Sequence, residues 1–317
     1  MREPLDRRLP TGLASAAPGQ PEAGGARIGI ATDDTAAHVA DICSELAALG
    51  ATGVPFRLAD CAFDASAPHG LRIPGFDDVL PDAVFVRALA GGSFEAVTRR
   101  LGILHALGAL GVPVTNSAKA MENCVDKSMT SFLLTRAGIA TPPAWAVETR
   151  AAAVAVAAGE CTSGPLVLKP LFGSQGRGLR LINSADDLPA PGDVSGVYCL
   201  QRFVRSTGEG YSDLRLLILR GRVLAAMKRR AENWIVNIRQ GGRPEHYLPS
   251  PQVTALALSA ASAVGAVFAG VDIIVGASGP CVIEVNSTPA WAGLQSVVDF
   301  DISAAVAADI LAMAKAR

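Results

Sequence analysis

A lysine and three glycines stand close together in the segment LVLKPLFGSQGRGLRLI, residues 166–182. Lys169 ends an apolar run, and Gly173, Gly176 and Gly178 follow it. Glycines let backbone N–H groups approach an anion closely, and a lysine adds a point charge to a phosphate. The segment therefore predicts a phosphate-binding loop, with an ordinary hairpin loop as the alternative.

The spacing of these glycines differs from that of two well-known nucleotide loops. A dinucleotide fingerprint has the pattern GxGxxG between a strand and a helix, and a P-loop has GxxxxGK followed by serine or threonine. Neither pattern occurs in the segment, and the residues LRLI after Gly178 favour a strand over a helix. We therefore expect the loop to lie at the tip of a β-hairpin.

A second group of residues carries oxygen donors on two neighbouring strands. The strands VDIIV and CVIEVN flank the turn residues GASGP, and a hairpin centred on Ser278 places Asp272 opposite Glu284. Asn286 points to the same face because it lies two residues after Glu284. Facing carboxylates on apolar strands repel each other unless a proton or a cation lies between them. The pattern predicts Mg²⁺ or Mn²⁺ bound by these three residues, with solvation or pairing to arginines elsewhere as the alternative.

The segment SDLRLLILRGRVLAAMKRR predicts a basic hairpin. A three-residue loop at residues 220–222 would place Asp213 opposite Arg229, with Arg215 on the same face. A two-residue turn would instead pair Asp213 with Lys228, and the sequence does not decide between the two registers. Arginines gathered on that face can hold a carboxylate or a transferring phosphoryl group through two parallel hydrogen bonds.

The residues NWIVNIRQGG follow this hairpin. Asn237 and Arg239 are polar candidates within them, and both become substrate-binding residues if the segment lines the same cleft. A surface loop is the alternative for this segment.

The elements around these residues predict an α/β chain with three lobes. Apolar strands alternate with amphipathic helices from Arg27 onward, which is typical of a small parallel sheet with helices on its faces. We expect this first lobe over residues 26–118, a second α+β lobe over 119–205 and a third over 206–317. The Pro, Gly and Ala content of residues 1–25 predicts a disordered leader.

Composition narrows the class of protein. The 317 residues are half hydrophobic and carry a formal net charge of -1, so nucleic acid and an anionic membrane are not indicated as partners. The six cysteines form no CxxC pair, which favours reduced thiols over a zinc site or a disulfide framework. The uncharged residues 253–271 predict a buried helix followed by a strand rather than a membrane span. We expect a cytoplasmic protein, and a homo-oligomer stays open.

Together these motifs resemble the ATP-grasp ligases, and within them the RimK-like amino-acid ligases. The resemblance covers residues 84–295 and rests on VDKSMTSFLLTRAGIATPP, PLVLKPLFGSQGRGL, LQRFV, DLRLLILRGRVLAAMKR and the two strands with Asp272 and Glu284. It implies a parallel-sheet pre-ATP-grasp domain followed by two α+β lobes that clamp ATP. It also implies an ATP- and Mg-dependent carboxylate-amine ligase that forms an amide bond through an acyl phosphate.

The resemblance assigns roles residue by residue. It implies phosphate or acyl-phosphate contacts by Arg215 and Arg229 beside Asp213, and metal binding by Asp272, Glu284 and Asn286. The residues that it implies for ATP binding are Lys127, Lys169, Gly173, Ser174, Gln175, Gly176, Gly178, Gln201, Arg202 and Phe203.

The sequence departs from the family pattern at three places, of which the first bears on contact with the adenine and the other two on the substrate. Arg202 stands where the family usually has an acidic hinge residue, NIRQGG replaces Asn-x-His-Arg-Gly-Gly, and NSTPAWAGLQ replaces Asn-Ser-x-Pro-Gly. The last two lie near the side of the cleft where the family resemblance places the acceptor substrate. The residues RALAGGSFEAVTRRLGILHALGALGVPVTN with PAWAGLQ resemble a branch associated with tetrahydromethanopterin synthesis in methylotrophic bacteria, which implies a pterin-type carboxylate and glutamate as the amine. An ATP-binding scaffold without turnover and a D-alanine- or glutathione-type ligase are the alternatives.

Overall fold

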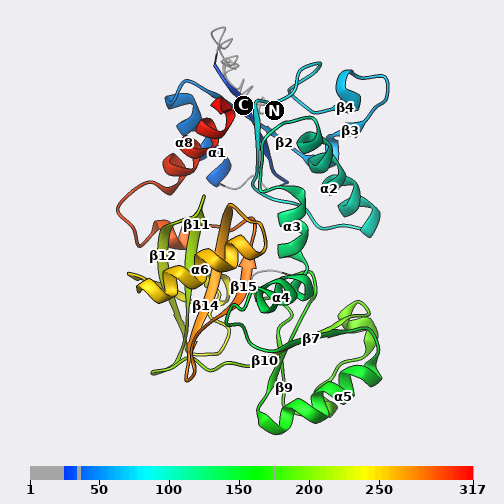
Figure 1. The fold of residues 1–317 in the computed structure, drawn as a ribbon, viewed down its shortest axis with the longest axis vertical. Coiled ribbons are helices and arrows are strands. Elements are labelled where there is room, and N and C mark those ends of the chain that lie inside the picture. The colour runs from blue at the N-terminus through cyan, green and yellow to red at the C-terminus, as the bar shows by residue number, and fades with distance from the viewer. Residues whose placement is uncertain (1–24, 34–36, 174–175, 317) are drawn as a thin grey trace, which may run out of the picture.

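The computed structural model describes residues 25–33, 37–173 and 176–316 of the chain. Residues 1–24 of the predicted leader and the predicted ATP-binding residues Ser174 and Gln175 lie outside this part. Besides the two-stranded pair of β3 and β4, three larger sheets follow one another along the long axis of the molecule, with the N-terminal sheet at the top of Figure 1 and the sheet of β7 to β10 at the bottom.

The N-terminal sheet is parallel and has the strand order β2-β1-β5-β6. The chain returns to it at the end, because α8 packs beside α1 and shares one apolar core with Ile28, Ile30 and Phe85. The elements of this region are β1 (Arg27–Ala31), α1 (Ala37–Ala48), β2 (Thr52–Phe56), β3 (Ala62–Phe63), β4 (Leu71–Arg72), β5 (Ala83–Val86), α2 (Phe94–Ala109), β6 (Val114–Thr115) and α8 (Ile302–Lys315).

The second sheet has the order β7-β10-β8-β9 and is antiparallel. One of its faces packs against α5, where Ala153 and Ala157 meet Leu166, Leu168 and Tyr198. Strands β8 and β9 pair directly across the glycine loop, which confirms the hairpin predicted there. The elements are α3 (Ala118–Val125), α4 (Lys127–Arg136), β7 (Ala144–Val147), α5 (Arg150–Glu160), β8 (Leu166–Lys169), β9 (Arg180–Ile182) and β10 (Tyr198–Arg202).

The third sheet is antiparallel, has the order β13-β12-β11-β14-β15 and is covered on one face by α6. Helix α6 followed by β14 confirms the helix and strand predicted for residues 253–271. No helix in the described ranges is long and apolar enough to cross a membrane. The elements are β11 (Tyr211–Leu219), β12 (Arg222–Ala231), β13 (Arg243–His246), α6 (Pro251–Ala263), β14 (Phe268–Gly276), β15 (Gly279–Asn286) and α7 (Ala292–Gln295).

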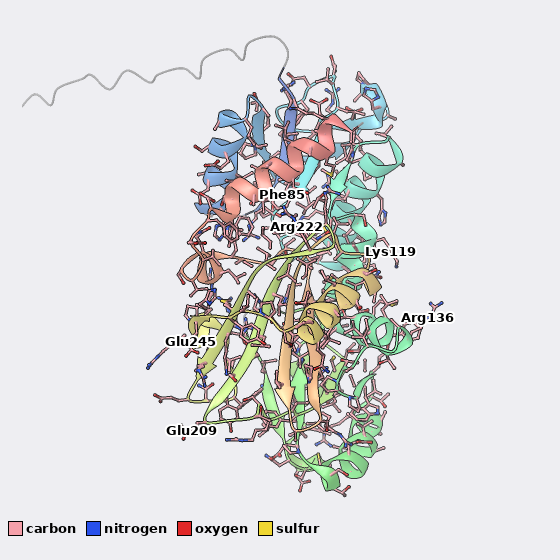
Figure 2. The ribbon with its side chains drawn as sticks, turned by 60° about the vertical axis from the view of Figure 1, so that its left-hand side comes forward. Phe85, Lys119, Arg136, Glu209, Arg222 and Glu245 are labelled. Atoms are coloured by element: carbon pink, nitrogen blue, oxygen red, sulfur yellow. The ribbon has the colours of Figure 1, made fainter. Side chains whose placement is uncertain are left out.

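The face of this sheet that points away from α6 is divided along the strands. Near the β11–β12 turn it is apolar, and Leu217, Leu219 and Met227 enter the core that contains Phe85 of the N-terminal sheet. Figure 2 shows this end of the hairpin at Arg222, close to Phe85, with Glu209 at the opposite end. Further from the turn the same face carries charged residues. The packing of the lobes thus leaves one polar stretch of sheet facing β8 and β10.

Candidate functional site

The charged stretch of the third sheet forms one wall of a cleft, and the second sheet forms the other wall. The cleft encloses about 910 Å³ of space, a volume that includes the solvent at its open mouth. The sequence-predicted residues that line it are Lys127, Lys169, Gly173, Gly176, Gln201, Arg202, Phe203, Asp213, Arg229, Asn237, Asp272 and Glu284.

Four other predicted residues are described but do not line this cleft: Gly178, Arg215, Arg239 and Asn286. Arg215 lies beside the cleft on the same face of the sheet, because it pairs with Asp272 on the neighbouring strand and its guanidinium is hydrogen-bonded to that carboxylate. Arg239 is exposed to solvent, whereas Asn237 is half-buried. The two polar candidates of the segment after β12 therefore lie in different surroundings.

A β-bulge positions Arg229. The turn between β11 and β12 has two residues, Arg220 and Gly221, both with positive φ as in a type I′ hairpin turn. A regular ladder from that turn would pair Asp213 with Lys228. The register shifts beyond Leu217, where Leu224 is the extra residue, and Asp213 pairs with Arg229. Of the two alternatives left open by the sequence, the turn is the two-residue one, whereas the pairing is the one expected from a three-residue loop.

A second bulge positions Glu284 in the same way. The β14–β15 turn joins Gly276 to Gly279, and a regular ladder would place Glu284 opposite Val271, on the face covered by α6. Ile283 is the extra residue, and Asp272 pairs with Glu284 as the sequence predicted. Because of these two bulges, Arg229, Asp272 and Glu284 face the same side of the sheet.

Four charged side chains form a network across β11, β12 and β14. Arg215 donates from Nε to Asp272 Oδ1 at 2.6 Å and from Nη2 to Asp272 Oδ2 at 2.5 Å. Arg229 donates from Nε to Asp213 Oδ1 at 2.7 Å and from Nη2 to Asp213 Oδ2, and its Nη2 lies 3.0 Å from Asp272 Oδ2. Asp213, Arg229 and Asp272 are each 2% exposed, so two buried carboxylates are neutralised by two guanidinium groups.

The protonation of this network follows from burial and from these pairs. Burial raises the pKa of Asp213, against the opposing effect of Arg229. Burial also acts to raise the pKa of Asp272, but Arg215 and Arg229 together outweigh it and lower that pKa. The alternative of pairing with arginines is therefore the one observed for Asp272. Its carboxylate is held in a fixed orientation at the cleft wall.

Two lysines approach the cleft from the side of the second sheet. Asp126 caps α4 by accepting from the N–H groups of Ser128 and Met129, which places Lys127 at the first residue of that helix. Lys127 Nζ donates to Gly173 O at 2.8 Å and lies 3.8 Å from Glu284 Oε1. Lys169 Nζ lies 3.4 Å from the carbonyl oxygen of Ile283, the bulged residue of β15. Burial lowers the pKa of Lys169, an effect that Glu284 partly offsets.

The predicted metal ligands offer oxygen atoms only. Asp272 and Glu284 are opposite each other, and the buried Nδ2 of Asn286, two residues further along β15, has no hydrogen-bond partner among the described residues. No three His, Cys, Asp or Glu side chains gather as metal ligands within the described ranges, and this trio has two carboxylates and an amide. Two carboxylates and an amide oxygen suit Mg²⁺, which normally completes its shell with water and phosphate oxygens. The residues present therefore fit such an ion.

Gln201, Arg202 and Phe203, which we call the hinge residues, lie at the end of β10 and directly after it. Arg202 does not point freely into the cleft, because its Nη2 is paired with the carboxylate of Glu160 at the end of α5. The backbone N–H groups of Arg202 and Phe203 donate to Pro143 O and Pro165 O. Since proline has no N–H, neither partner returns a hydrogen bond to the hinge carbonyls. The carbonyl oxygens of Arg202 and Phe203 therefore accept no hydrogen bond from Pro143 or Pro165.

Residues 232–242, which we call the bridging segment, complete the mouth of the cleft. The ring of Trp234 meets that of Phe203 edge to face, with centroids 6.0 Å apart and an interplanar angle of 84°. Trp234 was not predicted as a site residue, and neither was Glu160. A tryptophan in a polar loop and a glutamate at a helix end carry no local signal of a cleft, so the sequence offered no means to find them.

All six cysteines are free and none is exposed, which agrees with the reduced thiols predicted from the sequence. Burial raises the pKa of Cys61 and Cys124 to about 12. Thiols with such pKa values stay protonated at neutral pH and are poor nucleophiles. These two cysteines therefore belong to the core rather than to the chemistry of the cleft.

Comparisons with known proteins bear on the fold and on the class of chemistry. Residues 124–310, more than half of the chain, match the sequence model of the RimK-like ATP-grasp domain. The tetrahydromethanopterin:alpha-L-glutamate ligase of Methanosarcina acetivorans is 32% identical over 247 residues, which cover 67% of this chain and 74% of that protein. The enzyme of the same name from Methanococcus maripaludis is 36% identical over 198 residues, which cover 61% and 67% respectively.

A solved structure extends the likeness to almost the whole chain. The ATP-grasp ligase PsnB, complexed with a phosphomimetic variant of its minimal precursor, Mg and ADP, is 21% identical with a TM-score of 0.71. The match covers 92% of this chain and 99% of that chain. The fold expected from the sequence is therefore confirmed.

Proposed function

The chain belongs to the RimK-like ATP-grasp family of ADP-forming carbon-nitrogen ligases, and on this premise we propose that it joins glutamate to the carboxylate of a pterin-type cofactor. The names of the two relatives support glutamate as the amine and a tetrahydromethanopterin-like acid as its acceptor. The observation that carries the proposal is the cleft itself, in which Lys127, Lys169, Glu284, Asp272 and Arg229 converge from two sheets and one helix.

The proposed reaction has two steps. An oxygen of the acceptor carboxylate attacks the γ-phosphorus of ATP, the bond to the β-phosphate oxygen breaks, and ADP leaves. The amine nitrogen of glutamate then attacks the acyl carbon of the acyl phosphate, inorganic phosphate leaves, and the nitrogen loses a proton to solvent. Such transfers are accelerated mainly by positioning and by stabilising negative charge.

The chain's own residues supply both. Lys127 and Lys169 would neutralise the phosphates, as would the backbone N–H groups near Gly173 and Gly176. Asp272, Glu284 and Asn286 would hold Mg²⁺, with Mn²⁺ as an alternative, and the ion would shield the charge of the phosphates when bound. Arg229 at the cleft wall and Arg215 beside it, oriented by Asp213 and Asp272, would stabilise the anionic intermediate.

The hinge supports recognition of adenine by the backbone. The side chain of Arg202 forms an ion pair with Glu160. The backbone carbonyl groups of the hinge residues, rather than a charged side chain, would therefore contact the base. We place the reaction in the cytoplasm, where ATP is supplied and free thiols stay reduced.

A coupled assay tests the proposal. The purified full-length chain with Mg²⁺, ATP, glutamate and a tetrahydromethanopterin-type acid should release ADP and add one glutamyl unit to the acid for each ADP, as followed by mass spectrometry. Screening other acids and amines covers D-alanine- and glutathione-type acceptors. Tight ATP binding without acceptor-dependent ADP release for any pair would instead indicate a nucleotide-binding protein without turnover.

The site assignment has its own arm in the same assay. Asp272→Asn combined with Glu284→Gln should abolish Mg²⁺-dependent turnover, because the two carboxylates that would hold the ion are lost. The matched control exchanges two exposed acids of the second lobe, Glu148→Gln with Asp186→Asn. Unchanged turnover in the first variant would remove the metal assignment and leave the ligase reaction standing.

A further inference from the structure

The bridging segment contacts three separate parts of the molecule. Its Trp234 meets Phe203 of the hinge, and its Ile238 packs within van der Waals range of the position that a side chain on Gly293 of α7 would occupy. Its third contact is with Gly176, in the glycine turn formed by residues 176–178 between β8 and β9. The segment thus connects the nucleotide side of the cleft with the acceptor side.

The contact at Gly176 leaves no room for a side chain. A Cβ atom there would lie 2.6 Å from Asn237 Oδ1 and 2.8 Å from Ile235 Cγ2, closer than real Cβ contacts. Gly176 also has φ +70°, in the left-handed region that favours glycine. The backbone of the glycine turn therefore rests directly on the side chains of the opposite lobe.

The bridging segment is itself fixed where it receives this contact. The carbonyl oxygen of Asn237 accepts from the N–H groups of Gln240 at 2.8 Å and of Gly242 at 3.1 Å. A Cβ atom on Gly242 would lie 2.0 Å from Val236 O, so the chain closes on itself more tightly than any other residue would allow. Asn237 is consequently held by its own backbone and does not depend on the glycine turn for its position.

We propose that Asn237 is a positioning residue of the ligase reaction. Its side chain contacts the backbone of Gly176, a contact that we call the seat, and so fixes the position of the glycine turn over the cleft. This inference rests on the proposed function. Two residues thus contact the chain between β8 and β9: Lys127 donates a hydrogen bond to Gly173 O, and the side chain of Asn237 lies against Gly176. Loss of the seat displaces the backbone N–H groups that face the phosphates and admits water to the activated carboxyl group.

The contact between Asn237 and Gly176 should affect how much ATP is hydrolysed for each amide formed more than it affects the affinity for the nucleotide. Under the proposed function the base would lie at Gln201 to Phe203, and the atoms nearest to a Cβ at Gly176 belong to Asn237 and Ile235 rather than to these residues. Disturbing the seat should therefore raise the ratio of ATP hydrolysed to amide formed, while the Kd for ATP changes little. A residue with a merely structural role would not change that ratio.

The test compares two glycines of the same turn. Gly176→Ala introduces a side chain against Asn237 and Ile235, whereas Gly178→Ala, at φ +72°, introduces one that meets only Pro170 of its own loop, at 2.9 Å. The backbone strain is similar in the two variants. In the presence of Mg²⁺ and ADP, Gly176→Ala should raise hydrogen–deuterium exchange in peptides spanning the turn, and it should raise hydrolysis per amide by about tenfold. Gly178→Ala should change both much less.

A second background separates the contact from strain. In a chain that carries Ile235→Ala and Asn237→Ala, replacing Gly176 by alanine should add no more than replacing Gly178, because only backbone strain remains. Asn237→Ala alone should also raise exchange in the turn, which tests the seat if the Gly176 variant does not fold. Equal effects of the two alanine substitutions in both backgrounds would overturn the proposal.

Hydrogen–deuterium exchange in the turn and amide formation test the contact and the proposed function separately. Exchange in the turn requires only ADP and Mg²⁺ as probes, so a Gly176 effect on exchange without ligation by any acid and amine would reject the proposed function and keep the seat. Ligation with identical behaviour of the Gly176 and Gly178 variants would keep the function and reject the seat.

Discussion

Lys127, Lys169 and Glu284 form one group of charges in the cleft. Lys127 lies 3.8 Å from Glu284, and Lys169 faces the same carboxylate while burial lowers its pKa. Two positive charges thus lie around the same carboxylate in a poorly solvated place, and Asp272 acts on Lys169 more weakly. A bound polyanion would relieve this imbalance, which is why a nucleotide fits here better than a neutral ligand.

The residue scale yields a prediction for Lys169→Met. A lysine whose pKa is lowered on folding opposes folding wherever it is charged in the unfolded chain, that is, below its ordinary pKa of 10.5. The methionine variant should therefore unfold at a Tm about 2–4 °C higher at pH 7, and this gain should shrink as the pH rises toward 10. Thermal unfolding at several pH values measures it.

The same variant should lose the stabilisation that ATP gives. Mg²⁺ and ATP should raise the Tm of the unchanged chain and of Lys228→Met, which lies on the opposite face of β12 from Arg229, but not the Tm of Lys169→Met. A lower Tm without ligand would show that burial of Lys169 does not oppose folding, and undiminished stabilisation by ATP would show that Lys169 does not bind the phosphates.

At the scale of elements, two hairpins share one device. Each has a two-residue turn followed by a bulge, at Leu224 in β12 and at Ile283 in β15. Each bulge moves the far part of its strand by one residue, which turns Arg229 and Glu284 from the face under α6 to the face of the cleft. The extra residue also leaves its own backbone outside the ladder, and at Ile283 this carbonyl is the one near Lys169.

The pairing that results predicts how Arg229 responds to substitution. Arg229→Met removes the cation between two buried carboxylates and should lower the free energy of unfolding by about 3–5 kcal/mol. Combining it with Asp213→Asn removes one of those carboxylates, so the double variant should be more stable than the single one. Urea unfolding of both variants measures the difference. Additive losses would mean that the two side chains do not act as a pair.

Catalysis by Arg229 is better tested with a smaller change. Arg229→Lys keeps the charge but loses the two parallel hydrogen bonds to Asp213. This variant should lower kcat more than it weakens ATP binding, and the opposite result would assign Arg229 to nucleotide binding.

At the scale of the whole molecule, one asparagine joins the first lobe to the third. Asn116, which follows β6 and is 1% exposed, donates from Nδ2 to Phe268 O at 2.6 Å and to Ser287 O at 2.7 Å. Its Oδ1 accepts from the N–H groups of Val267 at 2.9 Å and Phe268 at 3.0 Å. These bonds reach the start of β14 and the residue after β15. They hold the strands that carry Asp272 and Glu284 against the N-terminal sheet.

Asn116→Ala should therefore weaken the junction between the lobes. It leaves two buried carbonyls and two N–H groups without their partner, and the loss should be about 2–4 kcal/mol. Asn123→Ala, which removes a single bond to Val264 O at 3.2 Å, is the matched control and should cost much less. Equal shifts in the unfolding midpoint of the two variants would show that the four bonds at Asn116 are not coupled to the stability of the junction.

The sequence by itself determined the types of chemistry and the local elements. The alternation of strands and helices, the two tight hairpins and the glycine connection between β8 and β9 depend on residues close together in the chain. Periodicity and turn chemistry fix such elements locally. The oxygen donors, the lysines and the arginines were likewise visible as residue types at a given spacing, and together they were sufficient to identify the family.

Only the tertiary structure decided which of these groups meet. The register of Arg229 depends on a bulge, and a bulge forms where packing on both faces of a sheet favours it over a regular ladder. The pairing of Asp272 with Arg215 and Arg229, of Arg202 with Glu160 and of Gly176 with Asn237 joins residues distant in the chain. Contacts of this kind arise from the way separate lobes pack, and no short segment of the sequence carries that information.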